Sequence, residues 1–206
     1  TLADEPLQVA TVGHDAPVPL LFAVDALSGH PLTCRYSGPM VDSERVHTET
    51  GAVGMAGPYS IKFEPNLPLM LRDGTFTYVD VFRPDAAGPF PGLLQRTPYD
   101  KSSPMSRVES LDAVRAAMNG YAVVIQDVRG RHSSDGEFTP FVDEMNDGHD
   151  SVEWVSSQPW CNGKVGMYGA SYVGATQWLA AKGVPPSLVC IAPGLTASDY
   201  HEGWTW

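Results

Sequence analysis

Cysteine, basic residues and long apolar runs are all scarce in this sequence. The three cysteines, Cys34, Cys161 and Cys190, have spacings that match neither a zinc site nor a disulfide framework. With 13 basic against 24 acidic residues, the net charge is -11, which disfavours binding to nucleic acid or to anionic lipid. No segment reaches the roughly 20 apolar residues that a membrane span requires. We therefore expect a soluble, cytoplasmic protein without a nucleic-acid or membrane partner.

The composition is that of a folded protein, but the first third of the chain differs from the rest. Apolar residues make up 43% of the sequence and aromatic residues 10%, which argues against global disorder. Prolines and glycines interrupt every candidate element in residues 1–65, where we expect an N-terminal extension of short strands and loops. Because the chain begins with Thr1 rather than Met, we expect either a processed start or a fragment.

From residue 66 onward, strand patterns alternate with helical patterns. The run at 121–125 is apolar throughout, as expected of a strand that is buried on both faces. We predict strands at 75–82, 92–95, 121–125, 164–168 and 188–192, and helices at 108–118, 144–157 and 172–182. Such alternation is typical of right-handed crossovers between parallel strands. The sequence therefore predicts an α/β fold of the α/β-hydrolase type, with a mostly parallel sheet and helices on both faces.

Two local signals refine the first elements of this region. Residues 75–82 are rich in β-branched and aromatic side chains and run into Arg83 and Pro84, which is typical of an edge strand. Residues 106–109 have the spacing of a helix capping box, and the pair at 119–120, Asn-Gly, supplies a helix stop. We therefore expect an edge strand at 75–82 and a helix that begins at the capping box.

A candidate nucleophile lies where a predicted strand gives way to a predicted helix, in the segment 169–174. A serine in such a sharp turn, here Ser171, is characteristic of the nucleophile elbow of α/β-hydrolases, in which small neighbours relieve crowding. The usual second glycine is displaced, because Val173 occupies its place and Gly174 comes one residue later. In this turn, we expect the backbone N–H of Tyr172 to point to where an oxyanion forms.

Two further segments follow predicted strands, whose carboxyl ends form the working edge of such a sheet. One contains Tyr99, which either offers its hydroxyl to an oxyanion or packs as a loop aromatic on the sheet edge. The other contains Asp127 and Arg129, just after the apolar run at 121–125. We expect Asp127 and Arg129 to brace loops through an ion pair rather than to touch a substrate.

Eight motifs occur in a fixed order between residues 66 and 206. They lie at 70–74, 80–84, 96–99, 120–124, 127–130, 135–138, 160–167 and 169–174. Together they resemble the X-Pro dipeptidyl-peptidase and cocaine-esterase-like (CocE/NonD) hydrolases, the S15 peptidase group that also includes α-amino-acid ester hydrolases. So many ordered matches make a chance similarity implausible. Residues 1–65 carry no such resemblance.

The resemblance implies a site and a chemistry. Ser171 matches the nucleophile of the family, the hydroxyl of Tyr99 matches one donor of its oxyanion hole, and the backbone of Tyr172 matches the other donor. Family members hydrolyse esters or amides without a cofactor or a metal, which implies a small ester, an amide or a short peptide as the substrate. We favour an esterase or acylase, because nothing in the sequence shows an anchor for a peptide amino terminus. An Xaa-Pro dipeptidyl-peptidase is the alternative.

The resemblance stops short of a complete catalytic triad. The acid and the base of the family follow the serine at later, separate strand ends, whereas only residues 172–206 follow Ser171 here. Asp199 and His201 occur in the right order, but they lie too close to each other and to the nucleophile, so we do not expect His201 to be the base. We expect residues 1–206 to lack the helical cap and the C-terminal jelly-roll domain of the family as well.

We therefore expect residues 66–206 to be the N-terminal half of the catalytic domain of a longer hydrolase. On its own, such a piece is expected to be inactive and prone to aggregation, because it lacks a base and leaves sheet edges uncovered. Two alternatives stay open. The chain is either a short, non-catalytic binding protein, or it pairs with a separate polypeptide that carries the missing Asp and His. The sequence does not predict an oligomeric state.

Overall fold

The computed structural model describes residues 57–197 and two short strands nearer the N-terminus. These two strands, β1 (Phe22–Val24) and β2 (Pro31–Thr33), pair in antiparallel fashion and form a sheet of their own. Four residues considered above lie outside the described residues: Thr1, Cys34, Asp199 and His201. Most of the predicted N-terminal extension lies outside them as well. The predicted domain boundary at residue 66 falls within the first strand of the main sheet.

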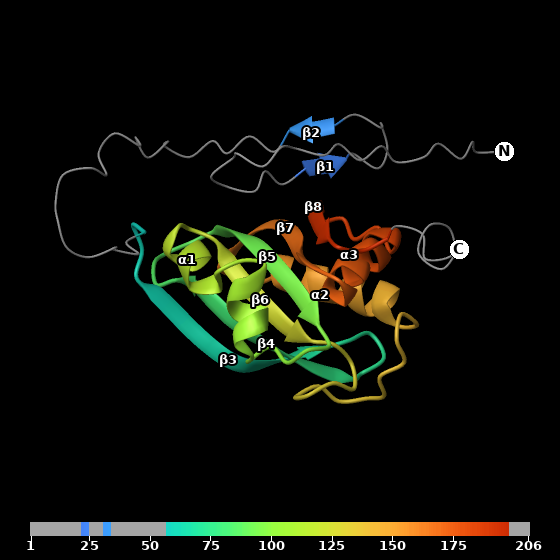
Figure 1. The fold of residues 1–206 in the computed structure, drawn as a ribbon. Coiled ribbons are helices and arrows are strands. Elements are labelled where there is room, and N and C mark those ends of the chain that lie inside the picture. Colours follow the sequence, from blue (N-terminus) through green and yellow to red (C-terminus); the bar gives the residue numbers. More distant parts are fainter. Residues whose placement is uncertain (1–21, 25–30, 34–56, 198–206) are drawn as a thin grey trace.

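Six strands form one mixed sheet in the order β3-β4-β6-β5-β7-β8 (Figure 1). Their bounds are β3 (Ile61–Met70), β4 (Phe76–Pro84), β5 (Phe90–Thr97), β6 (Ala122–Asp127), β7 (Cys161–Ala170) and β8 (Leu188–Gly194). Strands β6, β5, β7 and β8 run parallel, whereas β4 is antiparallel to β6 and β3 is antiparallel to β4. The predicted α/β fold with a mostly parallel sheet is therefore confirmed.

The position of β4 in the sheet differs from the prediction. Residues 75–82 were expected to form an edge strand, but β4 lies between β3 and β6. The outer strand at this end of the sheet is β3, which contains Pro65, Pro68 and a β-bulge. Proline has no N–H for a sheet ladder and is tolerated at an edge or a bulge. Pro84 was misleading as an edge signal because it is the last residue of β4.

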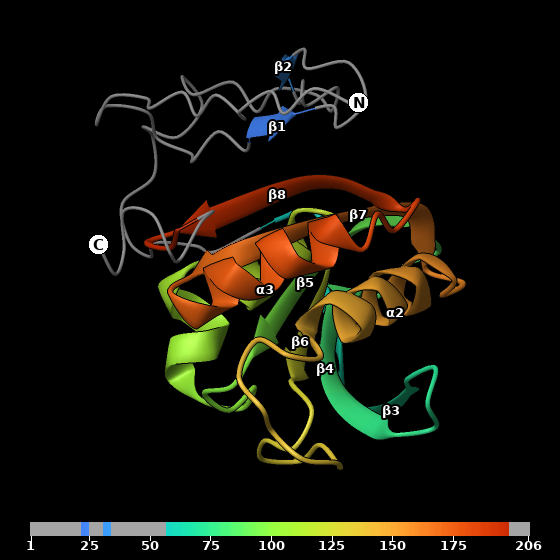
Figure 2. The ribbon, with the colours of Figure 1, turned by 90° about the vertical axis from the view of Figure 1, so that its right-hand side faces the viewer.

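Helices cover both faces of the sheet. Helix α1 (Ala113–Met118) packs on one face, and α2 (Glu144–Ser156) and α3 (Tyr172–Lys182) lie next to each other on the opposite face (Figure 2). Successive side chains of a strand point to opposite faces, so β6 contributes to both cores. Val123 and Ile125 belong to the core under α1, whereas Val124 belongs to the core under α2 and α3. All three side chains are fully buried.

The first helix begins later than the capping box predicts. Residues Met105–Glu109 form a single π-helical turn, and α1 starts after Asp112, whose side chain accepts a hydrogen bond of 2.9 Å from the N–H of Arg115. Ser106 is therefore not an N-cap, and Val108 is 57% exposed rather than part of an apolar helical face. The face that α1 buries is made of small residues, which let the helix approach the sheet closely: Ala113, Ala116 and Ala117.

The remaining predicted elements are confirmed. Helix α3 has the predicted bounds of 172–182, and α2 ends one residue earlier than predicted. Strands β5, β7 and β8 contain the predicted segments, and β6 begins one residue later than the predicted segment 121–125. Among the helices of the described residues, none has the length and apolar character needed to cross a membrane.

The two methionines of the sheet test the assignment of core and edge. Met167 of β7 is fully buried, whereas Met70 at the end of β3 is 62% exposed. We expect Met167→Ala to lower the free energy of unfolding by about 2–5 kcal/mol, because it removes buried methylene and methyl groups and leaves a cavity. The same change at Met70 should stay within about 0.5 kcal/mol. Chemical denaturation measures both; equal losses would contradict the assignment.

Candidate active site

The carboxyl ends of the four parallel strands lie at one edge of the sheet. In open α/β sheets, ligands bind just outside this edge. Ser171 follows directly after β7, and Tyr99 lies two residues beyond the end of β5, the strand that pairs with β7. The structure therefore places the predicted nucleophile and the predicted donor tyrosine after neighbouring parallel strands, at the same edge.

Ser171 occupies a sharp turn between a strand and a helix. It separates Ala170, the last residue of β7, from Tyr172, the first residue of α3. Its backbone has φ 61° and ψ -127°, and the residue is exposed. A positive φ of this kind costs a non-glycine residue about 1–3 kcal/mol and persists only where the surrounding structure enforces it. These are the features of a nucleophile elbow, which presents the serine hydroxyl at the edge of the sheet.

Two glycines make this turn possible. Gly169 has φ +128°, and a Cβ at this position would overlap with the side chain of Val173. Gly174 lies on the side of α3 that meets β8, where an added Cβ would lie 2.9 Å from the carbonyl oxygen of Gly194. The glycine that is displaced by one position from the usual motif is thus required by close packing between α3 and β8.

Backbone hydrogen bonds hold the elbow from the β8 side. The N–H of Ser171 donates to the carbonyl oxygen of Gly194 at 2.9 Å. The carbonyl oxygen of Ser171 accepts from the N–H groups of Gly174 and Ala175 at 2.9 and 3.1 Å. The N–H of Tyr172 belongs to the first turn of α3, where helix geometry offers no acceptor. This N–H is therefore available at the positive end of the helix dipole, beside the serine.

The loop that carries Tyr99 is fixed by buried polar groups. The carboxylate of Asp127, which is fully buried, accepts from the N–H of Lys101 at 2.8 Å and from the N–H of Ser133 at 3.2 Å. The N–H of Tyr99 itself donates to the hydroxyl of Thr97 at 3.0 Å. Tyr99 stays 40% exposed. Asp127 thus joins the loop after β5 to the loop after β6.

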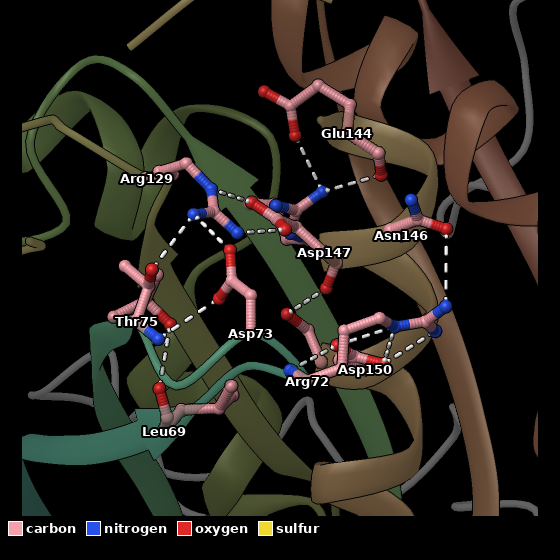
Figure 3. A network of polar contacts seen from close by, with 12 residues as sticks. Leu69, Arg72, Asp73, Thr75, Arg129, Glu144, Asn146, Asp147 and Asp150 are labelled. Carbon is pink, nitrogen blue, oxygen red and sulfur yellow. Dashed lines mark hydrogen bonds and ion pairs between the residues drawn. The ribbon is translucent and has the colours of Figure 1, made fainter. Parts of the chain in front are cut away.

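Arg129 braces a second junction, which Figure 3 shows from close by. Its guanidinium donates to Asp147 of α2 at 2.8 and 2.9 Å and to Asp73, in the turn between β3 and β4, at 2.7 Å. Arg129 lowers the pKa of Asp73 to about 2, chiefly through this hydrogen bond. The prediction that Asp127 and Arg129 brace loops is confirmed. Each of them pairs with other residues, however, and the two do not pair with each other.

A buried ion pair between β5 and the start of α2 was not predicted from the sequence. The side chain of Arg96, on β5, is fully buried, and its Nη1 lies 2.7 Å from Oε2 of Glu144, the first residue of α2. This contact is an ion pair without the alignment of a hydrogen bond. Arg96 also donates through Nε to Gln126 at 2.8 Å, and Gln126 donates to Thr77 at 2.7 Å. An arginine inside a buried strand signals an acidic partner, but the sequence does not say which of 24 acidic residues it is.

The side chain of Tyr172 connects this ion pair to the serine turn. Its hydroxyl donates to Oε1 of Glu144 at 2.9 Å and accepts from the N–H of Phe141 at 2.9 Å. The ring of Phe141 stacks on that of Tyr172, with centroids 4.8 Å apart. Burial, together with the nearby charge of Glu144, raises the pKa of Tyr172 well above its usual value, so the phenol keeps its proton. The side chain next to the serine is therefore neutral and held by two hydrogen bonds.

The described residues offer a serine hydroxyl and hydrogen-bond donors at this edge. Within the ranges that the structure describes, no group of three or more His, Cys, Asp or Glu side chains could hold a metal ion. The two described histidines, His132 and His149, each bond through a ring nitrogen to a backbone carbonyl, of Pro98 and Gly183, at 3.0 Å. An exposed serine hydroxyl at this edge of the sheet suits nucleophilic attack on a carbonyl group.

The mostly parallel sheet, the helices on both of its faces and the strained serine turn are those of an α/β-hydrolase fold. Comparison with known families gives the more specific assignment. Residues 73–206 match the family model described as X-Pro dipeptidyl-peptidase (S15 family). The chain belongs to this family, whose members are hydrolases.

Individual relatives agree with this assignment. The chain is 45% identical over 150 residues to a cocaine esterase from Rhodococcus sp. (strain MB1 Bresler), an alignment that covers 72% of this chain and 26% of that protein. A CocE/NonD family hydrolase from Staphylococcus aureus superimposes with a TM-score of 0.57 at 28% identity, covering 65% of this chain and 29% of the other. An α-amino acid ester hydrolase gives a TM-score of 0.55 at 28% identity, covering 75% and 28%. The chain spans about a quarter of the length of the curated relatives it matches.

Substitution of Gly169 tests whether the close packing of this residue against Val173, just before the serine turn, requires a glycine. Gly169→Ala should lower the free energy of unfolding more than Gly163→Ala, because both positions have a positive φ but only Gly169 has Val173 in the way. We expect the difference to be about 1–3 kcal/mol, which is typical of overpacking. Thermal or chemical denaturation of the two variants measures this difference. If Gly163→Ala lowers the free energy of unfolding as much as Gly169→Ala does, crowding against Val173 is not the cause of the loss at Gly169.

Proposed function

We propose that this chain supplies the nucleophile and the oxyanion hole of a serine hydrolase that cleaves ester or amide bonds. The observation that carries the proposal is the strained backbone of Ser171 between β7 and α3, at the edge where ligands of such sheets bind. Membership of a hydrolase family supports it. Because the chain spans only part of its relatives, the activity refers to the full-length product of its gene.

The proposed reaction is acyl transfer to water. The oxygen of Ser171 attacks the substrate carbonyl carbon while a histidine takes the hydroxyl proton, and an aspartate orients that histidine. Among the described residues, no histidine bonds to the hydroxyl of Ser171, so we assign neither the base nor the acid. The oxyanion of the tetrahedral intermediate accepts from the N–H of Tyr172 and the hydroxyl of Tyr99. Its collapse expels the alcohol or amine, which receives the proton, and water then releases the acid from the serine by the same steps.

We propose a small ester as the preferred substrate, and an amide or a short peptide as the alternative. The ester is supported by the cocaine esterase, which is 45% identical over the shared residues. The family model, which is described by an X-Pro dipeptidyl-peptidase, is the reason to keep the peptide alternative. The proposal requires neither a cofactor nor a metal, because a serine, a histidine base with its aspartate, and two neutral donors carry out the acyl transfer with the protein's own groups. A cytoplasmic location and the absence of nucleic-acid and membrane partners stay predictions.

The nucleophile is tested by removing its hydroxyl. Full-length protein is expected to hydrolyse p-nitrophenyl acetate and to be labelled by a fluorophosphonate probe on the peptide that contains Ser171, and Ser171→Ala should abolish both signals. Ser157→Ala is the matched control, because this exposed serine follows α2 and its hydroxyl bonds only to the carbonyl oxygen of Trp154. Hydrolysis by Ser171→Ala at the rate of the parent protein would refute the proposal.

The donor role of Tyr99 has its own test. We expect Tyr99→Phe to lower kcat for p-nitrophenyl acetate by about 10²–10³-fold with little change in KM, because an oxyanion donor acts mainly in the transition state. Tyr59→Phe is the control, since its ring packs against Phe90 at the start of β5, the far end of the strand from Tyr99. Steady-state kinetics of both variants measure the effect. An unchanged kcat for Tyr99→Phe would show that Tyr99 is a packing residue and not an oxyanion donor.

A further inference from the structure

Tyr172 connects two parts of the molecule that have different tasks. Its backbone N–H is the proposed oxyanion donor, and its side chain reaches away from the serine to the start of α2. There the hydroxyl donates to Glu144 and accepts from the N–H of Phe141, both at 2.9 Å. A hydroxyl that both donates and accepts has its direction fixed. The ring that carries it is fixed as well, by the stacked ring of Phe141.

The elbow needs such a support on the α2 side. The strained backbone of Ser171 is tied to β8 through the hydrogen bond from its N–H to Gly194. That bond holds the peptide group before the serine. The peptide group after the serine carries the N–H of Tyr172. It is held by the hydrogen bonds at the start of α3 and by the contacts that the side chain of Tyr172 makes with Glu144 and Phe141. Because strained turns persist only when their surroundings enforce them, this second attachment bears on the geometry of the site.

We propose that Glu144 is a positioning residue for the oxyanion hole. By holding the hydroxyl of Tyr172, the carboxylate of Glu144 keeps the N–H of Tyr172 aimed at the position of the oxyanion. This inference rests on the proposed function, since it assigns a task to a residue that does not touch the substrate. It places Glu144 and Arg96 in a chain of contacts that runs from the middle of the sheet to the catalytic turn.

Arg96 holds the carboxylate in place. Its Nη1 lies 2.7 Å from Oε2 of Glu144 and also donates to the main-chain carbonyl oxygen of Glu144 at 3.2 Å. The other end of the guanidinium donates to Gln126 on β6 at 2.8 Å, so Arg96 is anchored in the sheet. Oε1 of Glu144 is then left to accept from Tyr172. The two oxygens of one carboxylate thus join the sheet to the elbow.

Removal of a single hydroxyl tests the proposal. In the full-length protein, Tyr172→Phe keeps the ring and its stacking but deletes the bond to Glu144. We expect kcat for p-nitrophenyl acetate to fall by about 10–100-fold, less than for the loss of a whole donor, with KM within about twofold. Phenylboronic acid forms a tetrahedral adduct with an active-site serine, and its Kd should rise by the same factor as kcat falls, because both report the oxyanion hole.

Tyr168→Phe is the matched control. The hydroxyl of Tyr168 is buried in β7, three residues before Ser171, and has no hydrogen-bond partner. Its removal should leave kcat, KM and the boronate Kd unchanged. Glu144→Gln should lower kcat at least as much as Tyr172→Phe; should it fail to fold because Arg96 loses its counter-charge, Tyr172→Phe alone decides.

The outcomes separate the inference from the proposed function. A Tyr172→Phe protein with a lower melting temperature but unchanged kcat and boronate affinity would show that the bond to Glu144 serves stability alone, which overturns the inference. If that result comes with an inactive Ser171→Ala protein, the proposed function still stands. Activity that survives Ser171→Ala overturns the proposed function, and the inference with it.

Discussion

The ion pair between Arg96 and Glu144 is the contact on which the arrangement around the serine depends. Both side chains are almost completely withdrawn from water, which is unfavourable for two charges unless their geometry compensates for it. The compensation comes from three neighbours: Gln126 in the sheet, the main chain at the start of α2, and Tyr172 at the start of α3. Loss of either charge would leave the other buried and unpaired, at a typical cost of about 3–5 kcal/mol. The pair therefore connects β5 to the start of α2 and, through Tyr172, to the start of α3.

The strained backbone of Ser171 is held in place by the elements around it. Ser171 adopts a backbone conformation that is unfavourable for a residue with a side chain. Its N–H bonds to Gly194 at the end of β8, and the next residue, Tyr172, bonds to Glu144 at the start of α2. Glycines at 169 and 174 remove the Cβ atoms that would collide with Val173 and with β8. The result is a hydroxyl that is exposed at the end of a buried strand, next to a helix N-terminus. An exposed serine in fixed surroundings is what the proposed acyl transfer requires of a scaffold.

The parts that could be predicted from the sequence depend on short-range patterns. The apolar run at 121–125 and the glycines around Ser171 led to β6, β7 and α3 with nearly correct bounds. Predictions failed where two local signals competed, because Asp112 rather than Ser106 caps α1, and where a proline was ambiguous, because Pro84 ends an inner strand. The ion pair joins residues 96 and 144, which are distant in the sequence, so only the fold selects Glu144 as the partner.

The central claim is that Ser171 presents its oxygen to the substrate, while Tyr172 in the same turn and Tyr99 in the loop after β5 donate to the oxyanion. The most direct measurement is a crystal structure of the full-length protein after reaction with diethyl p-nitrophenyl phosphate, whose phosphorus forms a tetrahedral adduct on a nucleophilic serine. The account predicts phosphorus bonded to the oxygen of Ser171, with one phosphoryl oxygen about 2.7–3.1 Å from both the N–H nitrogen of Tyr172 and the hydroxyl of Tyr99. An adduct on another residue, or a phosphoryl oxygen that faces solvent away from both donors, would contradict it.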